Sequence, residues 1–156
     1  MRTLRAGKNL GFPDGEAVLG QCKAIVTILI DYPTVDQIVE LNKEALATIK
    51  IKKADSHRVL SRARILAAIG ETKSDAGDIY DKAASLLIAL TRVHAFDSGN
   101  RRTALLAALT FLRMNRETAR IVHDANVLLG VREGFYSKNE IRDWLKGHAV
   151  RKFERK

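Results

Sequence analysis

The sequence predicts an all-α protein, a compact helical bundle of about six or seven helices with one central, buried helix. Three observations favour this class. Apolar residues recur at helical spacing along most of the chain after Thr34. Ser, Thr or Asp precedes several of these stretches, as a helix N-cap does. One stretch, residues 100–114, is apolar around most of its circumference, as expected of a helix that others surround.

Three helix starts are marked by polar residues. The predicted helices span residues 34–49, 56–70, 78–93, 100–114, 124–132 and 138–146. Thr34 has Gln37 three residues later, which is the pattern of a capping box. Ser137 and Glu140 repeat this pattern, and Asp124 is placed to cap the helix that follows it.

The second predicted helix depends on Ser56 as its N-cap and Gly70 as its end, with a loop expected over residues 71–77. The apolar residues of this segment are Val59, Leu60, Ala63, Leu66, Ala67 and Ile69. The third helix then places His94 at its C-terminal end.

The beginning of the chain allows two interpretations. Residues 1–12 are expected to be irregular. Residues 24–30, AIVTILI, are short and β-branched, as in a strand. Residues 16–30 fit one apolar helix equally well, and we favour the helix because no later segment reads as a partner strand.

The composition indicates one ordinary globular domain, with 156 residues of which 46% are hydrophobic and 29% charged. No apolar run approaches the roughly 20 residues of a membrane span. The basic N-terminus lacks the apolar segment of a signal peptide. The single Cys22 allows neither an internal disulfide nor a thiolate metal cage, so a reducing cytoplasm is the expected location.

The formal net charge of +9 implies an anionic partner, such as nucleic acid, nucleotide phosphates or an acidic protein. A solvated basic surface is the alternative. Nucleic acid is not expected, because the chain shows no aromatic interleaving and no helix with a coherent basic face. Four basic residues could line a cleft, but a solvated face is preferred for them: His57, Arg58, Arg62 and Arg64.

The polar chemistry is concentrated in residues 94–102, HAFDSGNRR, directly before the apolar helix. The first N–H groups of a helix have no intrahelical partner, and the helix dipole favours negative charge there. Arg101 and Arg102 oppose that dipole. Because a bound anion would compensate for this cost, the two arginines indicate a phosphate site.

Other residues of the turn suit the same chemistry. A neutral His94 could act as a general base, and Gly99 can take backbone angles that bring N–H groups around a phosphate. Asn100 could bind a phosphoryl oxygen or hold the turn. Asp97 or Ser98 could instead be an ordinary helix cap, and His94 a capping or core histidine.

A family resemblance enters at this motif, which reads His94-x-Phe96-x-x-Gly99-Asn100-Arg101-Arg102-Thr103-Ala104-Leu105. The string resembles the signature of the Fic/Doc superfamily, whose Doc (death-on-curing) branch carries H-x-F-x-(D/N)-(A/G)-N-K-R-T-A. Tyr32-Pro33-Thr34, followed by Ile38 and Leu41, is similar to the start of Doc-like domains. The resemblance covers residues 31–147, which leaves 1–30 as an N-terminal extension and 148–156 as a basic tail that we expect to be frayed.

The resemblance implies transfer of a phosphate-containing group from a nucleotide to a protein hydroxyl. In such proteins the residue matching His94 is the general base. Those matching Gly99 and Asn100 hold phosphate, together with the N–H groups of the turn, and the one matching Arg102 pairs with a nucleotide phosphate. Phe96 matches the buried structural residue. ATP or another nucleoside triphosphate is the implied substrate.

The first departure from the family concerns the metal. Ser98 stands where the family has an acidic residue or Asn that holds Mg²⁺. Mg²⁺ favours carboxylate oxygens. Either the adjacent Asp97 substitutes, or phosphates and water hold most of the ion, or activity is weakened.

The second departure concerns the reaction. Arg101 replaces the second Gly of the Fic turn, where Doc has Lys, and Leu105 replaces a later Fic Arg, again as in Doc. A bulky cation should obstruct the triphosphate pose used for AMP transfer. The Doc branch binds its nucleotide the other way round and transfers the terminal phosphate. A Doc-like toxin kinase acting on a translation factor, as Doc toxins act on elongation factor Tu, is therefore the leading hypothesis. AMP transfer and a degenerate Fic-fold binding or regulatory protein are the alternatives.

The resemblance also implies a partner. Many Fic proteins carry an inhibitory (S/T)-x-x-x-E-(G/N) helix, and this string is not found here. The Doc branch takes its inhibition from a separate antitoxin, and an acidic, partly disordered segment would suit a charge of +9. The expected partners are thus a nucleotide, a target protein and an antitoxin, without a membrane.

Overall fold

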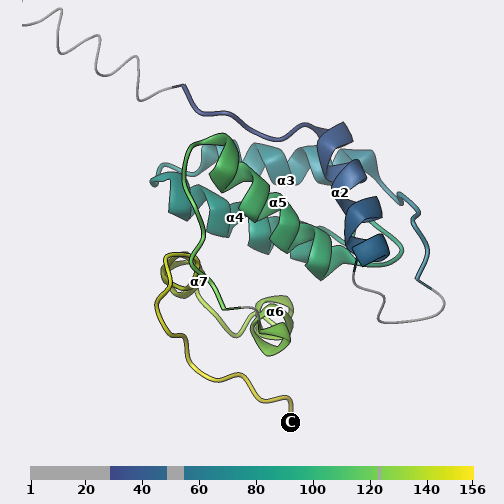
Figure 1. Ribbon diagram of the computed structural model, residues 1–156. Coiled ribbons are helices and arrows are strands. Elements are labelled where there is room, and N and C mark those ends of the chain that lie inside the picture. The colour runs from purple at the N-terminus through teal and green to yellow at the C-terminus, as the bar shows by residue number, and fades with distance from the viewer. Residues whose placement is uncertain (1–28, 49–54, 123) are drawn as a thin grey trace, which may run out of the picture. The chain divides into compact units, whose positions relative to one another are not determined.

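A computed structural model describes residues 29–48, 55–122 and 124–156 of the chain, and Figure 1 shows their helices. These are α2 (Val35–Thr48), α3 (Arg62–Ser74), α4 (Ile79–Val93), α5 (Asn100–Met114), α6 (Ala125–Arg132) and α7 (Lys138–Leu145). Within the described ranges the only β structure is an isolated bridge between Val59 and Phe96. The predicted all-α class is therefore confirmed. The helix preferred for residues 16–30 lies almost wholly outside the described residues, and the proposed extension stays a prediction.

The predicted N-caps of three helices are confirmed. The N–H of Gln37 donates to Thr34 Oγ1 at 3.1 Å, and the N–H of Thr34 donates back to Gln37 Oε1 at 2.8 Å. Ser137 and Glu140 make the same reciprocal pair before α7. The carboxylate of Asp124 caps α6. These caps are local in sequence, which is why the pattern alone was sufficient to find them.

The start and end predicted for the second helix are wrong. α3 begins after Ser61, whose Oγ accepts the N–H of Arg64 at 3.2 Å, and it continues through Gly70 to Ser74. Ser56 lies outside it, in a segment whose continuation pairs with the turn after α4 through the bridge at Val59. That pairing takes residues 58–61 out of the helix.

The apolar residues of this segment lie only partly in the core. Of the six apolar residues, Ile69 is buried, whereas Leu60 and Leu66 are 44% and 62% exposed. The buried face consists of Ile65, Ala68, Ile69 and Thr72. Because α3 carries apolar residues on two sides, its periodicity could not identify the side that faces the core.

Helices α4 and α5 form the centre of the bundle. α4 packs against α3, α5, α6 and α7, and α5 packs against α2, α4 and α6. The predicted burial of α5 is confirmed, with α4 sharing the central position; the buried residues of α5 are Thr103, Ala104, Leu105, Ala107, Ala108, Phe111 and Leu112. No described helix is both long and apolar enough to pass through a lipid bilayer.

The C-terminal tail is docked, contrary to the frayed tail that we expected. Arg151 donates to the Glu140 carboxylate at 2.8 and 3.0 Å and to the Phe135 carbonyl at 2.8 Å. Tyr136 Oη donates to the Arg151 carbonyl at 2.7 Å. The ring of Phe153 lies 5.3 Å from that of Phe135, measured between centroids. Aromatic packing and a charge-assisted bond hold this tail where composition alone suggested fraying.

Candidate active site

The turn between α4 and α5 presents His94. This residue ends α4 in the left-handed conformation, with φ 53° and ψ 57°, and its side chain is exposed. Its carbonyl accepts a hydrogen bond from Arg64 Nη1 at 3.1 Å. The left-handed residue turns the chain sharply, so the imidazole lies in solvent at the start of the turn and not in the core.

Backbone pairing with residues 58–61 holds the same turn. The Ala95 carbonyl accepts the N–H groups of Leu60 and Ser61 at 2.8 and 3.3 Å. The N–H of Asp97 donates to the Arg58 carbonyl at 3.0 Å. Phe96 is 2% exposed between these bonds, as the resemblance implied for this residue. The short ladder and the buried ring fix the backbone next to His94.

Asn100 holds the turn with both atoms of its amide. Its Oδ1 accepts the N–H of Phe96 at 3.0 Å, and its Nδ2 donates to the Phe96 carbonyl at 2.8 Å. Of the two roles open from the sequence, the structure therefore shows the turn-holding one. The phosphate-binding role implied by the family stays a prediction.

Gly99 is the N-cap of α5, and among the described residues no side-chain cap is found for this helix. Its φ of 79° lies in the left-handed region that favours glycine. A Cβ at this position would lie 2.9 Å from Leu46 Cδ2 and 3.3 Å from Asn42 Nδ2. Neither Asp97 nor Ser98 is the cap, so the first N–H groups of α5 are left for another acceptor.

Asn42 is a residue of this site that the sequence analysis missed. It is fully buried on α2, and its Nδ2 donates to the Ser98 carbonyl and to Thr103 Oγ1, both at 2.9 Å. Its Oδ1 lies 2.7 Å from His57 Nδ1. Because an amide oxygen only accepts, Nδ1 of His57 carries the hydrogen. The available signal was the position of Asn42 on the apolar face, four residues after Ile38.

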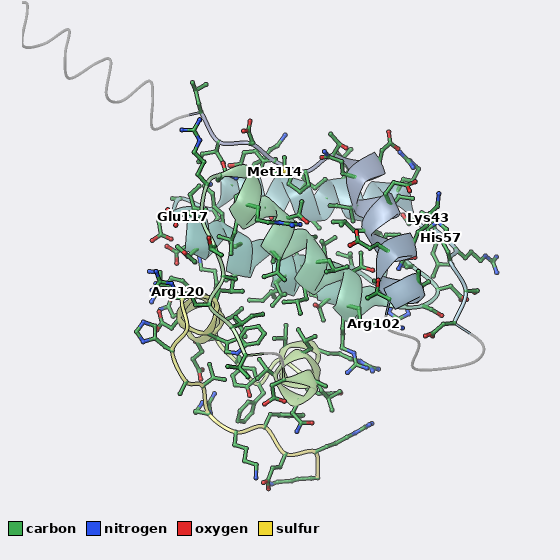
Figure 2. All side chains as sticks on the ribbon, in the orientation of Figure 1. Lys43, His57, Arg102, Met114, Glu117 and Arg120 are labelled. Atoms are coloured by element: carbon green, nitrogen blue, oxygen red, sulfur yellow. The ribbon has the colours of Figure 1, made fainter. Side chains whose placement is uncertain are left out.

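Asp55 and Ser56 add two more contacts to the motif. Asp55 Oδ2 pairs with Arg102 Nη2 at 3.0 Å, and these side chains are only 9% and 13% exposed. Ser56 Oγ donates to Asp97 Oδ2 at 3.0 Å. Asp55 and Ser56 thus contact the motif directly, whereas His57 is linked to it through Asn42. Figure 2 shows His57 beside α2 and Arg102 at the α6 end of α5.

Arg101 lies among other cations. It is half-buried in the first turn of α5. Burial lowers its pKa, as do the nearby charges of Arg132, Arg102 and Arg155, while Glu133 acts in the opposite direction. Burial disfavours any charge here, but the positive neighbours would attract an incoming anion.

The metal ligands expected from the sequence fit Mg²⁺ only in part. Asp97 places one exposed carboxylate on the turn, where Ser56 already donates to it. Ser98 offers a hydroxyl, and its carbonyl is taken by Asn42. Across the described ranges no group of three or more His, Cys, Asp or Glu residues could hold a metal ion. By itself the turn therefore offers Mg²⁺ one carboxylate and one hydroxyl.

The structure thus brings together the eight residues that the sequence singled out: His94, Phe96, Asp97, Ser98, Gly99, Asn100, Arg101 and Arg102. Residues 30–112 match the Fic/DOC family, which is more than half of the chain. A stretch of 37 residues is 57% identical to "Toxin Doc" of Mycolicibacterium smegmatis (strain ATCC 700084 / mc(2)155) and covers 24% of this chain and 28% of that protein. The motif, its helical setting and the family match agree, and the chain belongs to the Fic/DOC family.

Proposed function

We propose that this protein is a Doc-like toxin that transfers the terminal phosphate of a nucleoside triphosphate to a hydroxyl of a target protein, with a translation elongation factor as the target class. One observation carries the proposal. An exposed histidine, His94, and the uncapped N-terminus of α5 lie at the two ends of one short, rigid turn. Phosphoryl transfer to a hydroxyl needs a base and an anion site close to each other.

The proposed reaction needs few groups. His94 takes the proton of the target hydroxyl as its oxygen attacks the γ-phosphorus. The bond to the β–γ bridging oxygen breaks, and the nucleoside diphosphate leaves. The N–H groups at the start of α5, with Arg101, hold the phosphate oxygens. Mg²⁺, when bound through Asp97 and the phosphates, would supply further charge neutralisation.

The choice of phosphate over AMP as the transferred group rests on two residues. Arg101 fills the turn position at which Fic-type AMP transferases have Gly. Leu105 is only 7% exposed on α5 and supplies no cation. Both features support the Doc-type orientation of the nucleotide that the resemblance implied.

A non-catalytic role is the second candidate, and specific contacts favour it. Arg102, the expected phosphate ligand, is paired with Asp55 in a largely buried ion pair. Ser98 replaces the expected metal ligand. In this alternative the protein keeps the fold and binds a partner without transferring a group.

Incubation with an acceptor lysate and either γ-labelled or α-labelled ATP tests the proposal. We expect protein-bound label from the γ position only. Replacing His94 by Asn, which tolerates the left-handed backbone, should lower transfer about 100-fold or more, in the range of a lost general base. His148→Asn is the matched control, because this exposed histidine lies in the tail.

Two results would reject the kinase. Label transferred from the α position alone would identify AMP transfer. Equal activity of the wild type and the His94→Asn variant, or no transfer by either, would leave the binding role.

An antitoxin and a cytoplasmic location belong to the same proposal. The net charge of +9 would favour an acidic antitoxin segment. The relative that matches over 37 residues is named a toxin, which supports a toxin–antitoxin pair for this chain as well. Co-purification with the product of a neighbouring gene for a short acidic protein is the expected result.

A further inference from the structure

The site contains two adjacent arginines whose surroundings differ. Arg102 is held by Asp55 at 3.0 Å, with both side chains largely buried. Burial is the main cause that lowers the pKa of Arg101, and the charges of Arg132, Arg102 and Arg155 lower it further, while Glu133 acts in the opposite direction. The positive potential at the start of α5 is therefore expected to centre on Arg101.

The C-terminal tail packs against α6. Phe153 is half-buried, and its ring lies so close to Gly130 that a Cβ there would come within 3.1 Å of Phe153 Cγ. The ring of Tyr136 would come within 2.4 Å of the same Cβ. Gly130 thus forms a seat that only a residue without a side chain can provide.

Arg151 fastens the tail just before this seat. Its guanidinium carbon lies 4.2 Å from the centroid of the Phe135 ring, and its bonds to Glu140 are the strongest influence on that carboxylate, whose pKa they help to lower to about 2. The tail is therefore anchored at residues 151 and 153, and not only by chain connectivity. Figure 1 shows it passing α6 on its way to the C-terminus.

Two basic residues follow the contact between α6 and the tail. Arg155 follows Phe153 by two residues, and Arg132 follows Gly130 by two residues. α6 also packs against α5, which carries Arg101 in its first turn. Like charges brought together in this way destabilise the free protein, and a multivalent anion between them would reverse that effect.

We propose that Arg101, Arg132 and Arg155 form an anion site for the phosphate chain of the nucleotide, with Arg155 supplied by the anchored tail. The inference deepens the proposed function and rests on it for the identity of the ligand. The site extends beyond the motif, because Arg132 and Arg155 lie after residue 112, where the family match ends. In this proposal the two adjacent arginines have different roles. Arg102 pairs with Asp55, and Arg101 contacts the ligand.

The test measures binding of inorganic pyrophosphate to the full chain by titration calorimetry. Arg132→Gln and Arg155→Gln should each weaken binding about tenfold, as expected when one charge-assisted contact is lost. Phe153→Ala keeps every arginine but loosens the seat at Gly130, so it should weaken binding as well. Lys152→Gln is the matched control, because Lys152 is in the same tail and is paired with Glu154 at 2.8 Å.

The inference is overturned if the wild type does not bind pyrophosphate, or if Lys152→Gln weakens binding as much as Arg155→Gln. The first result would remove the site, and the second would reduce it to net charge. The assay is independent of phosphate transfer. Arginine-dependent binding without transfer would overturn the kinase and keep the site, whereas His94-dependent transfer with binding indifferent to Arg155 would keep the kinase and overturn the site.

Discussion

The two central helices begin in opposite ways. α4 starts behind a full capping box, in which Asp78 accepts the N–H of Asp81 at 2.9 Å and Asp81 accepts the N–H of Asp78 at 3.0 Å. α5 starts behind Gly99 without a side-chain cap, and its first turn contains Arg101 and Arg102. Acids complement a helix dipole at the N-terminus, and cations oppose it. The first arrangement favours stability, and the second leaves room for an anion.

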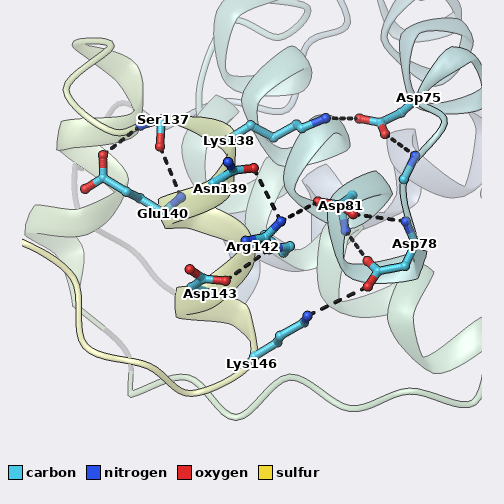
Figure 3. Close-up of polar contacts among 11 residues, drawn as sticks. Asp75, Asp78, Asp81, Ser137, Lys138, Asn139, Glu140, Arg142, Asp143 and Lys146 are labelled. Atoms are coloured by element: carbon cyan, nitrogen blue, oxygen red, sulfur yellow. Dashed lines mark hydrogen bonds and ion pairs between the residues drawn. The ribbon is translucent and has the colours of Figure 1, made fainter.

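The charges around the start of α4 are also matched in pairs. Figure 3 shows two bases of α7 and the residue that follows this helix reaching three acids, namely Lys138 to Asp75 at 2.7 Å, Arg142 to Asp81 at 3.2 Å and Lys146 to Asp78 at 3.7 Å. At the start of α5 Arg102 has Asp55, while Arg101 faces mostly cations. Acids and bases are therefore paired at the start of α4. Among the described residues, cations predominate around Arg101 at the start of α5, where the candidate active site lies.

The largest effect is expected at the backbone of the α5 start. Gly99→Ala should lower the free energy of unfolding by about 2–4 kcal/mol, because an alanine at positive φ is strained and its Cβ would overpack Leu46 and Asn42. Gly134→Ala is the matched control. Gly134 has a similar φ of 71°, but nothing lies within 4 Å of its Cβ position.

Urea denaturation of both variants separates the two causes. The control should lose only about 1–2 kcal/mol from backbone strain. Equal losses in the two variants would show that the contact with Leu46 and Asn42 has no consequence and that conformation alone requires glycine at position 99.

A smaller effect, dependent on pH, is expected at the α4 side. Burial raises the pKa of Asp75, but the hydrogen bonds from Lys138 and from the N–H of Gly77, with the charges of two lysines, more than compensate and hold it below its usual 3.8. The unfolded chain then binds a proton at higher pH than the folded one. The stabilisation is fully present above about pH 5 and is lost as the pH falls through the folded pKa.

Urea midpoints measured between about pH 6 and pH 2 test this sign. The Asp75→Asn variant should be less stable than the wild type at pH 6, and the difference should shrink in acid. Lys138→Gln should flatten the profile in the same way, because it removes the partner of Asp75. Parallel profiles for the wild type and Asp75→Asn would contradict the assignment.

The comparison also shows what the sequence could and could not predict. The caps at Thr34, Asp124 and Ser137 join residues two or three positions apart, so a short pattern was sufficient. The contacts of Asn42 with Thr103 and of Asp55 with Arg102 join residues 61 and 47 positions apart. No local pattern encodes such pairs, because they depend on how the helices pack.

The motif lies between these cases. Its spacing located the turn and the helix start, since both are local. It could not show that Arg101 and Arg102, adjacent in sequence and equal in charge, have different partners. The start of α3 was missed for a similar reason, because the bridge from Val59 to Phe96 competes with the helix and is invisible in a single stretch of sequence.

The smallest expected effect is an increase in the free energy of unfolding, which is the opposite of the usual effect of a mutation. Arg101→Gln should raise the free energy of unfolding by about 0.3–1 kcal/mol, because it removes a cation from a helix N-terminus and from the neighbourhood of three arginines. Asp78→Ala at the start of α4 should instead lower it by about 1 kcal/mol through loss of the cap.

Thermal unfolding with and without pyrophosphate measures the stability of both variants. In Arg101→Gln the stabilisation by pyrophosphate should fall while the free protein gains stability, whereas Asp78→Ala should respond to pyrophosphate as the wild type does. A free Arg101→Gln protein less stable than the wild type would mean that this arginine serves the fold, and the contrast between the two helix starts would lose its functional meaning.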